Sequence, residues 1–119
     1  MRLDPELART ILAKVAELPF DGGPHDIGVE GKSAEEVAYH VMLLHQRGLL
    51  DACDASTLDG PCWMPRYLTY EGNEFLSAAE NEDLWNRAVT TVRTRIGTVT
   101  IEALKVVLAE IVRQLLTRP

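Results

Sequence analysis

Side chains that could make specific contacts gather on one side of the segment from Ser33 to Leu50. Drawn as a helix at about 100° per residue, the segment places on one arc Tyr39, His40, Leu43, Gln46 and Arg47, beside Glu35 and Glu36. On a helix that enters a DNA groove, such polar groups could contact bases or backbone phosphates. An aromatic and an aliphatic side chain ringed by charge are also typical of a protein interface. A solvated surface without a partner is the third interpretation.

A second candidate surface follows Pro61, where Trp63, Met64 and Arg66 lie close together in the sequence. An exposed tryptophan beside an arginine could stack on a nucleic-acid base or fill a pocket of a protein partner. In the alternative interpretation, Trp63 folds over a sheet and belongs to the core. The candidate contact residues for DNA or a partner are therefore Tyr39, His40, Leu43, Gln46, Arg47, Trp63 and Arg66.

The side chains best suited to bind a transition metal do not have the spacing of a metal site. They are Cys53, Cys62, His25, His40 and His45, whereas zinc sites draw on tight pairs such as Cys-x-x-Cys. The chain also lacks a nucleophile elbow, a glycine-rich phosphate loop and a His-Glu pair at zinc spacing. We expect no catalytic residue, metal, cofactor or small-molecule substrate. Free thiols are expected in a reducing cytosol, with a disulfide across a hairpin as the alternative.

Capping residues predict two helices in the first half of the chain. Asp4 can cap a helix over 5–18, whose apolar residues recur at helical spacing. Ser33 and Glu36 form a capping box that starts the second helix, and Gly48 can end it in a left-handed conformation. The core-facing arc of this second helix is expected to hold Ala34, Val37, Ala38, Val41 and Leu44.

The connections favour one β-hairpin and little other sheet. Residues 19–32 contain two prolines and four glycines, which predicts a loop with a short strand around Asp26 to Val29. Residues 49–53 and 66–69 are the strand candidates, joined by a loop whose Asp-Gly-Pro suits a turn. Such a hairpin could form the wing of a winged helix.

Three further helices are predicted in the rest of the chain. Thr69 can cap a helix that reaches Ala79, Asn81 can cap one around 84–96, and the last helix runs over 100–116. The apolar stripe of the last helix is broader than one core contact needs, which favours a homodimer through this helix. Its candidate dimer face is Leu104, Leu108, Ile111 and Leu115.

The order of these elements predicts an α+β fold that is mainly helical: a winged-helix-like domain with a β-hairpin wing and extra C-terminal helices. At 119 residues the chain fits a single domain over 1–119, with the winged-helix core in 1–80 and a helical extension in 81–119. No apolar run approaches the roughly 20 residues of a membrane span. The start of the sequence lacks the apolar core of a signal peptide, so we expect a cytoplasmic protein without a membrane partner.

Charge divides unevenly along the chain. Residues 1–83 hold six Lys/Arg and sixteen Asp/Glu, or −10, whereas residues 84–119 hold six and two, or +4, which together give −6. An acidic front repels phosphate at long range, because affinity for nucleic acid comes mainly from Lys and Arg. The basic residues at the C-terminal end could form a nucleic-acid stripe or neutralise the acidic part of the fold: Arg87, Arg93, Arg95, Lys105, Arg113 and Arg118.

Three segments together span much of the chain: EEVAYHVMLLHQRGLLDA, RYLTYEGNEFLSAAENEDLWNRA and GTVTIEALKVVLAEIV. They resemble a family of small bacterial and phage-associated proteins, domain-of-unknown-function family 2513. The resemblance implies no activity or site residue. From the fold analogy we expect a noncatalytic DNA-binding protein of the transcription-regulator type. The alternative is a protein-interaction module, a phage or host accessory factor that has lost DNA binding.

Overall fold

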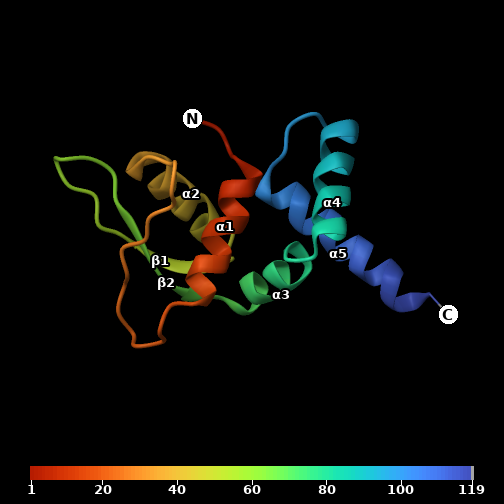
Figure 1. Cartoon of the computed structure of the whole chain (residues 1–119), viewed down its shortest axis with the longest axis horizontal. Helices are drawn as coiled ribbons and strands as arrows, with labels where there is room; N and C mark the ends of the chain where they lie inside the picture. The colour runs from red at the N-terminus through yellow and green to blue at the C-terminus, as the bar shows by residue number, and fades with distance from the viewer. Residues whose placement is uncertain (119) are drawn as a thin grey trace.

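The computed structural model of the chain describes residues 1–118 and has an α+β fold that is mainly helical (Figure 1). Its elements, in order, are α1 (Pro5–Ala16), α2 (Ala34–Gln46), β1 (Leu50–Asp54), β2 (Trp63–Leu68), α3 (Tyr70–Ala79), α4 (Glu82–Arg95) and α5 (Ile101–Thr117). The two strands form one antiparallel hairpin. No helix in the described part is long and apolar enough to cross a membrane.

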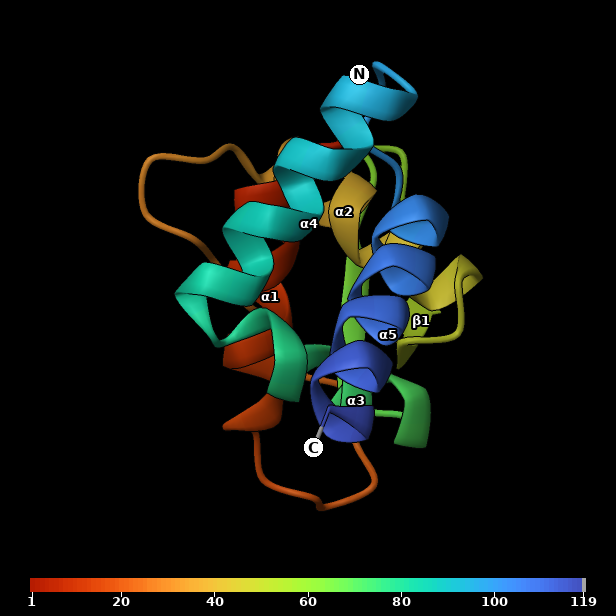
Figure 2. The same cartoon turned by 90° about the vertical axis from the view of Figure 1, so that its right-hand side faces the viewer.

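The elements form two halves that share one core. In Figure 1 the hairpin and α2 lie at one end of the molecule, α4 and α5 lie at the other, and α1 and α3 lie between them. Turned by 90°, Figure 2 shows α4 and α5 side by side in front of the first half. The buried apolar residues form a single cluster to which all five helices and the start of β1 contribute. The extents of 53 × 32 × 23 Å reflect this end-to-end arrangement.

The predicted capping residues start their helices. The Asp4 side chain accepts hydrogen bonds from the backbone of Glu6 and Leu7, and Ser33 and Glu36 form the reciprocal capping box. Thr69, Asn81 and Thr100 cap the three later helices. The first helix ends at Ala16, two residues before the predicted Leu18.

Gly48 ends α2 as predicted. It has φ +74°, its N–H donates to the His45 carbonyl, and the Leu49 N–H donates to the Leu44 carbonyl. These two bonds make a Schellman motif, and Leu49 is fully buried beneath it. The tight end of α2 therefore leads directly into β1.

The structure places His40 in the core, so the prediction of an outward His40 is wrong. Its side chain is 1% exposed and is the buried polar residue of the core. The Asp4 N–H donates to Nε2 over 2.8 Å, and Nδ1 lies 2.7 Å from the Glu36 carbonyl oxygen. Since Nε2 accepts the hydrogen bond from Asp4, Nδ1 carries the imidazole hydrogen and donates a hydrogen bond to the Glu36 carbonyl. A histidine with a partner on each nitrogen can be buried at little cost, which the helical arc alone does not reveal. Ala34, assigned to the core arc, is exposed.

The loop and the hairpin depart from the predicted strands. Residues 26–29 form no strand; the loop meets the sheet through the His25 N–H, which donates to the Pro65 carbonyl over 2.9 Å. β2 begins at Trp63 rather than Arg66, because Pro65 is tolerated on the outer edge of a two-stranded sheet. Asp51 pairs with Tyr67 and Ala52 with Pro65, so Arg66 is the extra residue of a β-bulge.

Gly72 explains why α3 can approach the end of α2. A Cβ built on Gly72 would lie 1.7 Å from the Leu49 carbonyl oxygen, so a larger residue has no room. Thr69 reinforces the contact: its hydroxyl donates to the Gly48 carbonyl, and its N–H donates to the Leu49 carbonyl. The Thr-x-x-Gly step is thus a close backbone packing between α3 and the α2–β1 junction.

Three of the four residues predicted as a dimer face belong to the core of the single chain. Leu104, Leu108 and Ile111 pack inside the common hydrophobic cluster, which corrects their assignment to an interface. Only Leu115 is exposed. The stripe on α5 is broad because its first part covers α3 and α4.

Candidate functional site

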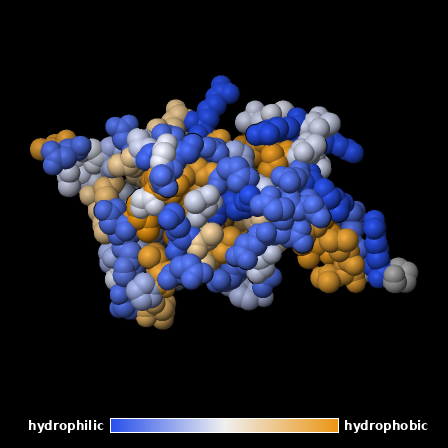
Figure 3. Space-filling model, in the orientation of Figure 1, coloured by the Kyte–Doolittle hydropathy of each residue, from blue (hydrophilic) through white to orange (hydrophobic). Residues whose placement is uncertain are grey.

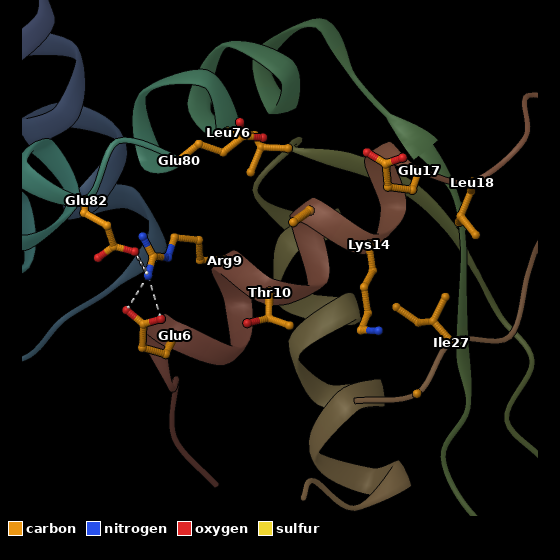
Figure 4. Close-up of a pocket in the computed structure, with 12 residues that line it drawn as sticks. Glu6, Arg9, Thr10, Lys14, Glu17, Leu18, Ile27, Leu76, Glu80 and Glu82 are labelled. Atoms are coloured by element: carbon orange, nitrogen blue, oxygen red, sulfur yellow. Dashed lines mark hydrogen bonds and ion pairs between the residues drawn. The ribbon is translucent and has the colours of Figure 1, made fainter. Parts of the chain in front are cut away.

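A first hollow runs along α1, and ion pairs between charged residues of its lining close one end of it (Figure 4). At one end Arg9 donates to both carboxylate oxygens of Glu6, at 2.9 and 3.1 Å, and lies 2.9 Å from Glu82. It also donates to the Ala79 carbonyl and lies over the ring of Trp85, 5.1 Å from the centroid. Both terminal nitrogens of Arg9 contact groups of the fold, so we assign this cluster to the packing of α1 on α3 and α4.

A second hollow of about 820 Å³ brings together residues from three distant parts of the chain. We call it the α2 groove. Tyr39, Leu43 and Arg47 of α2 line it, opposite Arg93 of α4. The remaining walls are the N-terminal segment and the α4–α5 connection: Met1, Arg2, Leu3, Pro5, Gly97, Thr98, Val99, Thr100, Ile101 and Glu102.

The α2 groove has an apolar floor and a basic rim. Tyr39 and Leu43 are half-buried, so part of each side chain remains open to a ligand. Arg47 lies 3.8 Å from Glu102, a long contact between two exposed groups that holds the arginine weakly. Within residues 1–118, Arg2 and Arg93 make no ion pair. The groove therefore carries a local positive charge on a chain whose net charge is −6.

The buried His40 fixes the N-terminal wall of the groove. Its bond from the Asp4 N–H attaches the chain next to Leu3, and the Asp4 carboxylate contacts Lys32 at 3.1 Å. Partial burial raises the pKa of Asp4, but hydrogen bonds from Lys32 and from the backbone of Leu7 and Glu6 outweigh it and lower the pKa below its usual value. The carboxylate thus caps α1, while the Asp4 N–H holds the N-terminal segment on α2.

The structure separates the predicted contact residues. Tyr39, Leu43 and Arg47 share the α2 groove, and Gln46 is exposed on α2 outside its lining. Trp63 packs against the core with its ring 5.6 Å from that of His45, which agrees with the alternative interpretation of this residue. Arg66 is held by Asp51 at 3.1 Å.

Sequence reasoning missed Arg2 and did not connect Arg93 to α2. Arg93 belongs to the C-terminal basic residues, but these do not form one surface: Arg93 lines the α2 groove, whereas Lys105 and Arg113 line a different groove between α3 and α5. Lys105 also pairs with Glu71 at 3.2 Å. The approach of the end of α4 to the α2 groove is a long-range arrangement without a local signal in the sequence.

Few side chains in the described part of the chain are placed for metal binding or disulfide formation. Residues 1–118 contain no cluster of three or more His, Cys, Asp or Glu that could hold a metal ion. Cys53 and Cys62 are both free thiols, and the register explains why: Cys53 lies opposite Met64, while Cys62 is bonded through its carbonyl to Ala55. The α2 groove is the candidate functional site.

Comparisons with known proteins place the chain in a family. The family profile described as "Hypothetical protein (DUF2513)" matches residues 2–98. A protein of Haemophilus influenzae, described as "Uncharacterized protein", is 32% identical over 117 residues, which cover 98% of this chain and 99% of that protein. No solved structure matches the chain at a significant level. The matched region contains Tyr39, Arg47 and Arg93, three of the residues that line the groove. The chain belongs to the DUF2513 family.

Proposed function

We propose that this chain is a noncatalytic, cytoplasmic binding module on a winged-helix-like core, and that its α2 groove binds a protein segment with acidic and aliphatic side chains. The observation that carries the proposal is the half-buried Tyr39–Leu43 floor inside a rim of Arg2, Arg47 and Arg93. An apolar floor takes an aliphatic anchor, and the arginines take carboxylates in bidentate pairs.

The element order supports the winged-helix-like part of the proposal. α1 and α2 pack together, the β1–β2 hairpin follows α2 directly, and α1 contacts β2. Compared with a winged helix, α2 takes the place of the recognition helix, and the β1–β2 hairpin takes the place of the wing. The loop 17–33 replaces the helix that would precede the recognition helix.

Charge favours a protein segment over DNA on this core. The first turn of a recognition helix usually contacts base edges, but the first turn of α2 carries Glu35 and Glu36. The wing carries the exposed Asp54 and Asp59, and Arg66 is already paired with Asp51. Carboxylates on both elements would face phosphate, which opposes binding. The arginines instead line the α2 groove, whose lining contains a single acid, Glu102.

The test is a selection of displayed random peptides of about 16 residues, long enough for four helical turns, on the wild-type chain and on the Tyr39→Ala/Arg47→Glu variant. We expect wild type to enrich sequences that combine Asp or Glu with Leu, Ile or Val, and the variant to lose them. The control is Gln46→Ala, which changes an exposed α2 residue outside the groove lining. Equal enrichment on all three proteins would contradict the proposal.

DNA remains the second candidate, and one observation favours it. Arg2 and Arg93 face the same groove and have no carboxylate partner within residues 1–118, so they could hold backbone phosphates. Fluorescence polarisation with random-sequence duplexes at low and physiological salt tests this. Binding that falls linearly on a log-log plot against salt, and that Arg93→Glu abolishes, would replace the protein segment with DNA as the ligand.

A further inference from the structure

The C-terminal part of α5 carries more apolar surface than the chain itself covers. Along one stripe of the helix, Leu108 is 2% exposed, Ile111 is 7% exposed and Leu115 is 44% exposed. The stripe therefore continues for one turn beyond the body of the molecule. In Figure 1 this end of α5 projects away from the other helices, and Figure 3 shows apolar surface gathered there.

A groove of about 470 Å³ runs beside this projecting end, between α3 and α5. We call it the α3–α5 groove. Tyr70 on α3 and Leu116 on α5 stand at its margins, and each is 80% exposed. The floor contains small and apolar side chains, among them Ala78, Ala109 and Val112. Small residues on a helix surface let a second helix approach closely.

The residues of α5 that line the α3–α5 groove have the spacing of a helix-pairing seam. Lys105, Ala109, Val112 and Leu116 follow one another at intervals of four, three and four. This is the interval of the two seam positions of a heptad, at which facing helices interlock. α5 thus carries two stripes: one covers α3 and α4, and this one faces the open groove.

The charges of the α3–α5 groove suit a second copy of the same chain in antiparallel orientation. Its α3 margin carries Glu71 and Glu74, and Glu74 makes no ion pair within residues 1–118. The end of α5 carries the opposite charge on Arg118, which makes no ion pair within residues 1–118, while Arg113 pairs with Glu110 of its own helix. Antiparallel pairing of two α5 helices brings the basic end of each copy to the acidic margin of the other, and a two-fold axis repeats the contact.

We propose that two copies of the chain associate through this surface, with Leu115 and Leu116 of each copy seated in the α3–α5 groove of the other. The last turn of α5, which carries Leu115 and Leu116, lies beside the α3–α5 groove. A single two-fold interface can therefore seat the last turn of each copy in the groove of the other. The dimer surface is therefore not the buried stripe of Leu104, Leu108 and Ile111 but the neighbouring stripe and the last turn.

Sedimentation equilibrium of the full chain, from about 1 μM to about 1 mM, tests the proposal over the range of weak and moderate affinities. Wild type is expected to reach twice the mass of one chain. Leu116→Glu places a charge in the seam and is expected to weaken association at least about tenfold, as loss of a central apolar contact does. Leu116 is exposed in the single chain, so the variant should fold, which circular dichroism checks.

Val106→Glu is the matched control, because Val106 is an exposed apolar residue of α5 that does not line the groove. It should associate like wild type. Tyr70→Glu adds a test from α3 and should weaken association as Leu116→Glu does. Glu74→Arg and Arg118→Glu should each weaken association, and the double variant should recover part of the loss. A wild type that stays a single chain at 1 mM, or equal effects of Leu116→Glu and Val106→Glu, would overturn the proposal.

Discussion

Two groups of arginines in this chain lie in opposite surroundings. Arg9 is surrounded by partners, with Glu6 and Glu82 at its guanidinium and the ring of Trp85 beneath it. Arg93 and Arg2 lie in the α2 groove without an ion-pair partner in residues 1–118. The Arg9 cluster joins α1 to α3 and α4, whereas Arg2 and Arg93 make no ion pair with any other element in the described part of the chain.

The difference separates charges that stabilise the fold from charges left available to a ligand. Removing a member of the Arg9 cluster leaves its partners without compensation in a partly buried site, so the free energy of unfolding should fall. Removing Arg2 or Arg93 from the α2 groove leaves behind no ion-pair partner in residues 1–118, so stability should hold while binding is lost.

Trp85→Ala should have the largest effect. The ring is 1% exposed, its Nε1–H donates to Glu6 over 2.7 Å, and it meets Phe75 edge-on. We expect the free energy of unfolding to fall by about 3–5 kcal/mol, as for other buried aromatic truncations. Urea denaturation followed by circular dichroism measures it. Tyr39→Ala, an aromatic truncation in the α2 groove, is the control and should cost much less; equal losses would contradict the division.

His40→Leu comes next and links the core to the α2 groove. The substitution leaves the Asp4 N–H and the Glu36 carbonyl without the imidazole, and we expect a loss of about 1–3 kcal/mol in urea denaturation. The released N-terminal segment should also exchange its amide hydrogens faster at residues 2–4. His45→Leu is the matched control, since its imidazole makes one hydrogen-bond contact, to the Leu50 carbonyl at 3.3 Å, and none to the N-terminal segment. Unchanged exchange in His40→Leu would exclude this histidine as the anchor of the segment.

Arg9→Lys tests the geometry of the paired cluster with the charge retained. Lysine cannot reproduce the bidentate contact with Glu6, the bond to Ala79 and the position over Trp85 together. We expect a loss of about 1–2 kcal/mol in the same assay, in the range of hydrogen bonds to charged groups. Arg93→Lys should leave stability within about 0.5 kcal/mol of wild type, as surface changes usually do. Equal losses of unfolding free energy in Arg9→Lys and Arg93→Lys would contradict the difference between the two groups of arginines.

The smallest effect is expected on how the stability of the fold depends on acidic pH. The pKa of Asp4 lies below its usual value, so its carboxylate stabilises the folded state above about pH 4. That contribution is lost as the pH falls through the folded pKa, when Asp4 gains a proton and its contact with Lys32 weakens. Asp4→Asn keeps a capping side chain without the charge, and its stability should change less than that of wild type between pH 5 and pH 3. Thermal unfolding of both proteins across this pH range measures the difference. Parallel plots of stability against pH for wild type and Asp4→Asn would contradict the prediction.

Local signals predicted the helices and not the groove. Asp4, Ser33, Thr69 and Asn81 each start a helix where expected, because a cap acts within three residues of itself. His40 was misplaced because its partner Asp4 lies 36 positions away. A helical arc sorts side chains by polarity and has no information on such partners.

The same limit applied to the larger surfaces. Tyr39, Leu43 and Arg47 were identified from α2 alone, whereas Arg2 and Arg93 reach the groove only through the packing of the N-terminus and α4. On α5, periodicity identified an apolar stripe but not how much of it α3 and α4 cover. Leu104 and Leu108 are buried in the single chain, so the proposed dimer surface is the neighbouring stripe of α5, which contains Val112 and Leu116.

The central claim, that the α2 groove is the binding surface of this chain, is tested most directly by parallel peptide selection on wild type and on Arg2→Glu/Arg93→Glu. Both substitutions lie in the groove and outside the Arg9 cluster, so the variant should keep the stability of wild type. We predict that acidic and aliphatic peptides enrich on wild type and are lost on the variant. Identical enrichment on the two proteins, or none on wild type, would contradict the claim.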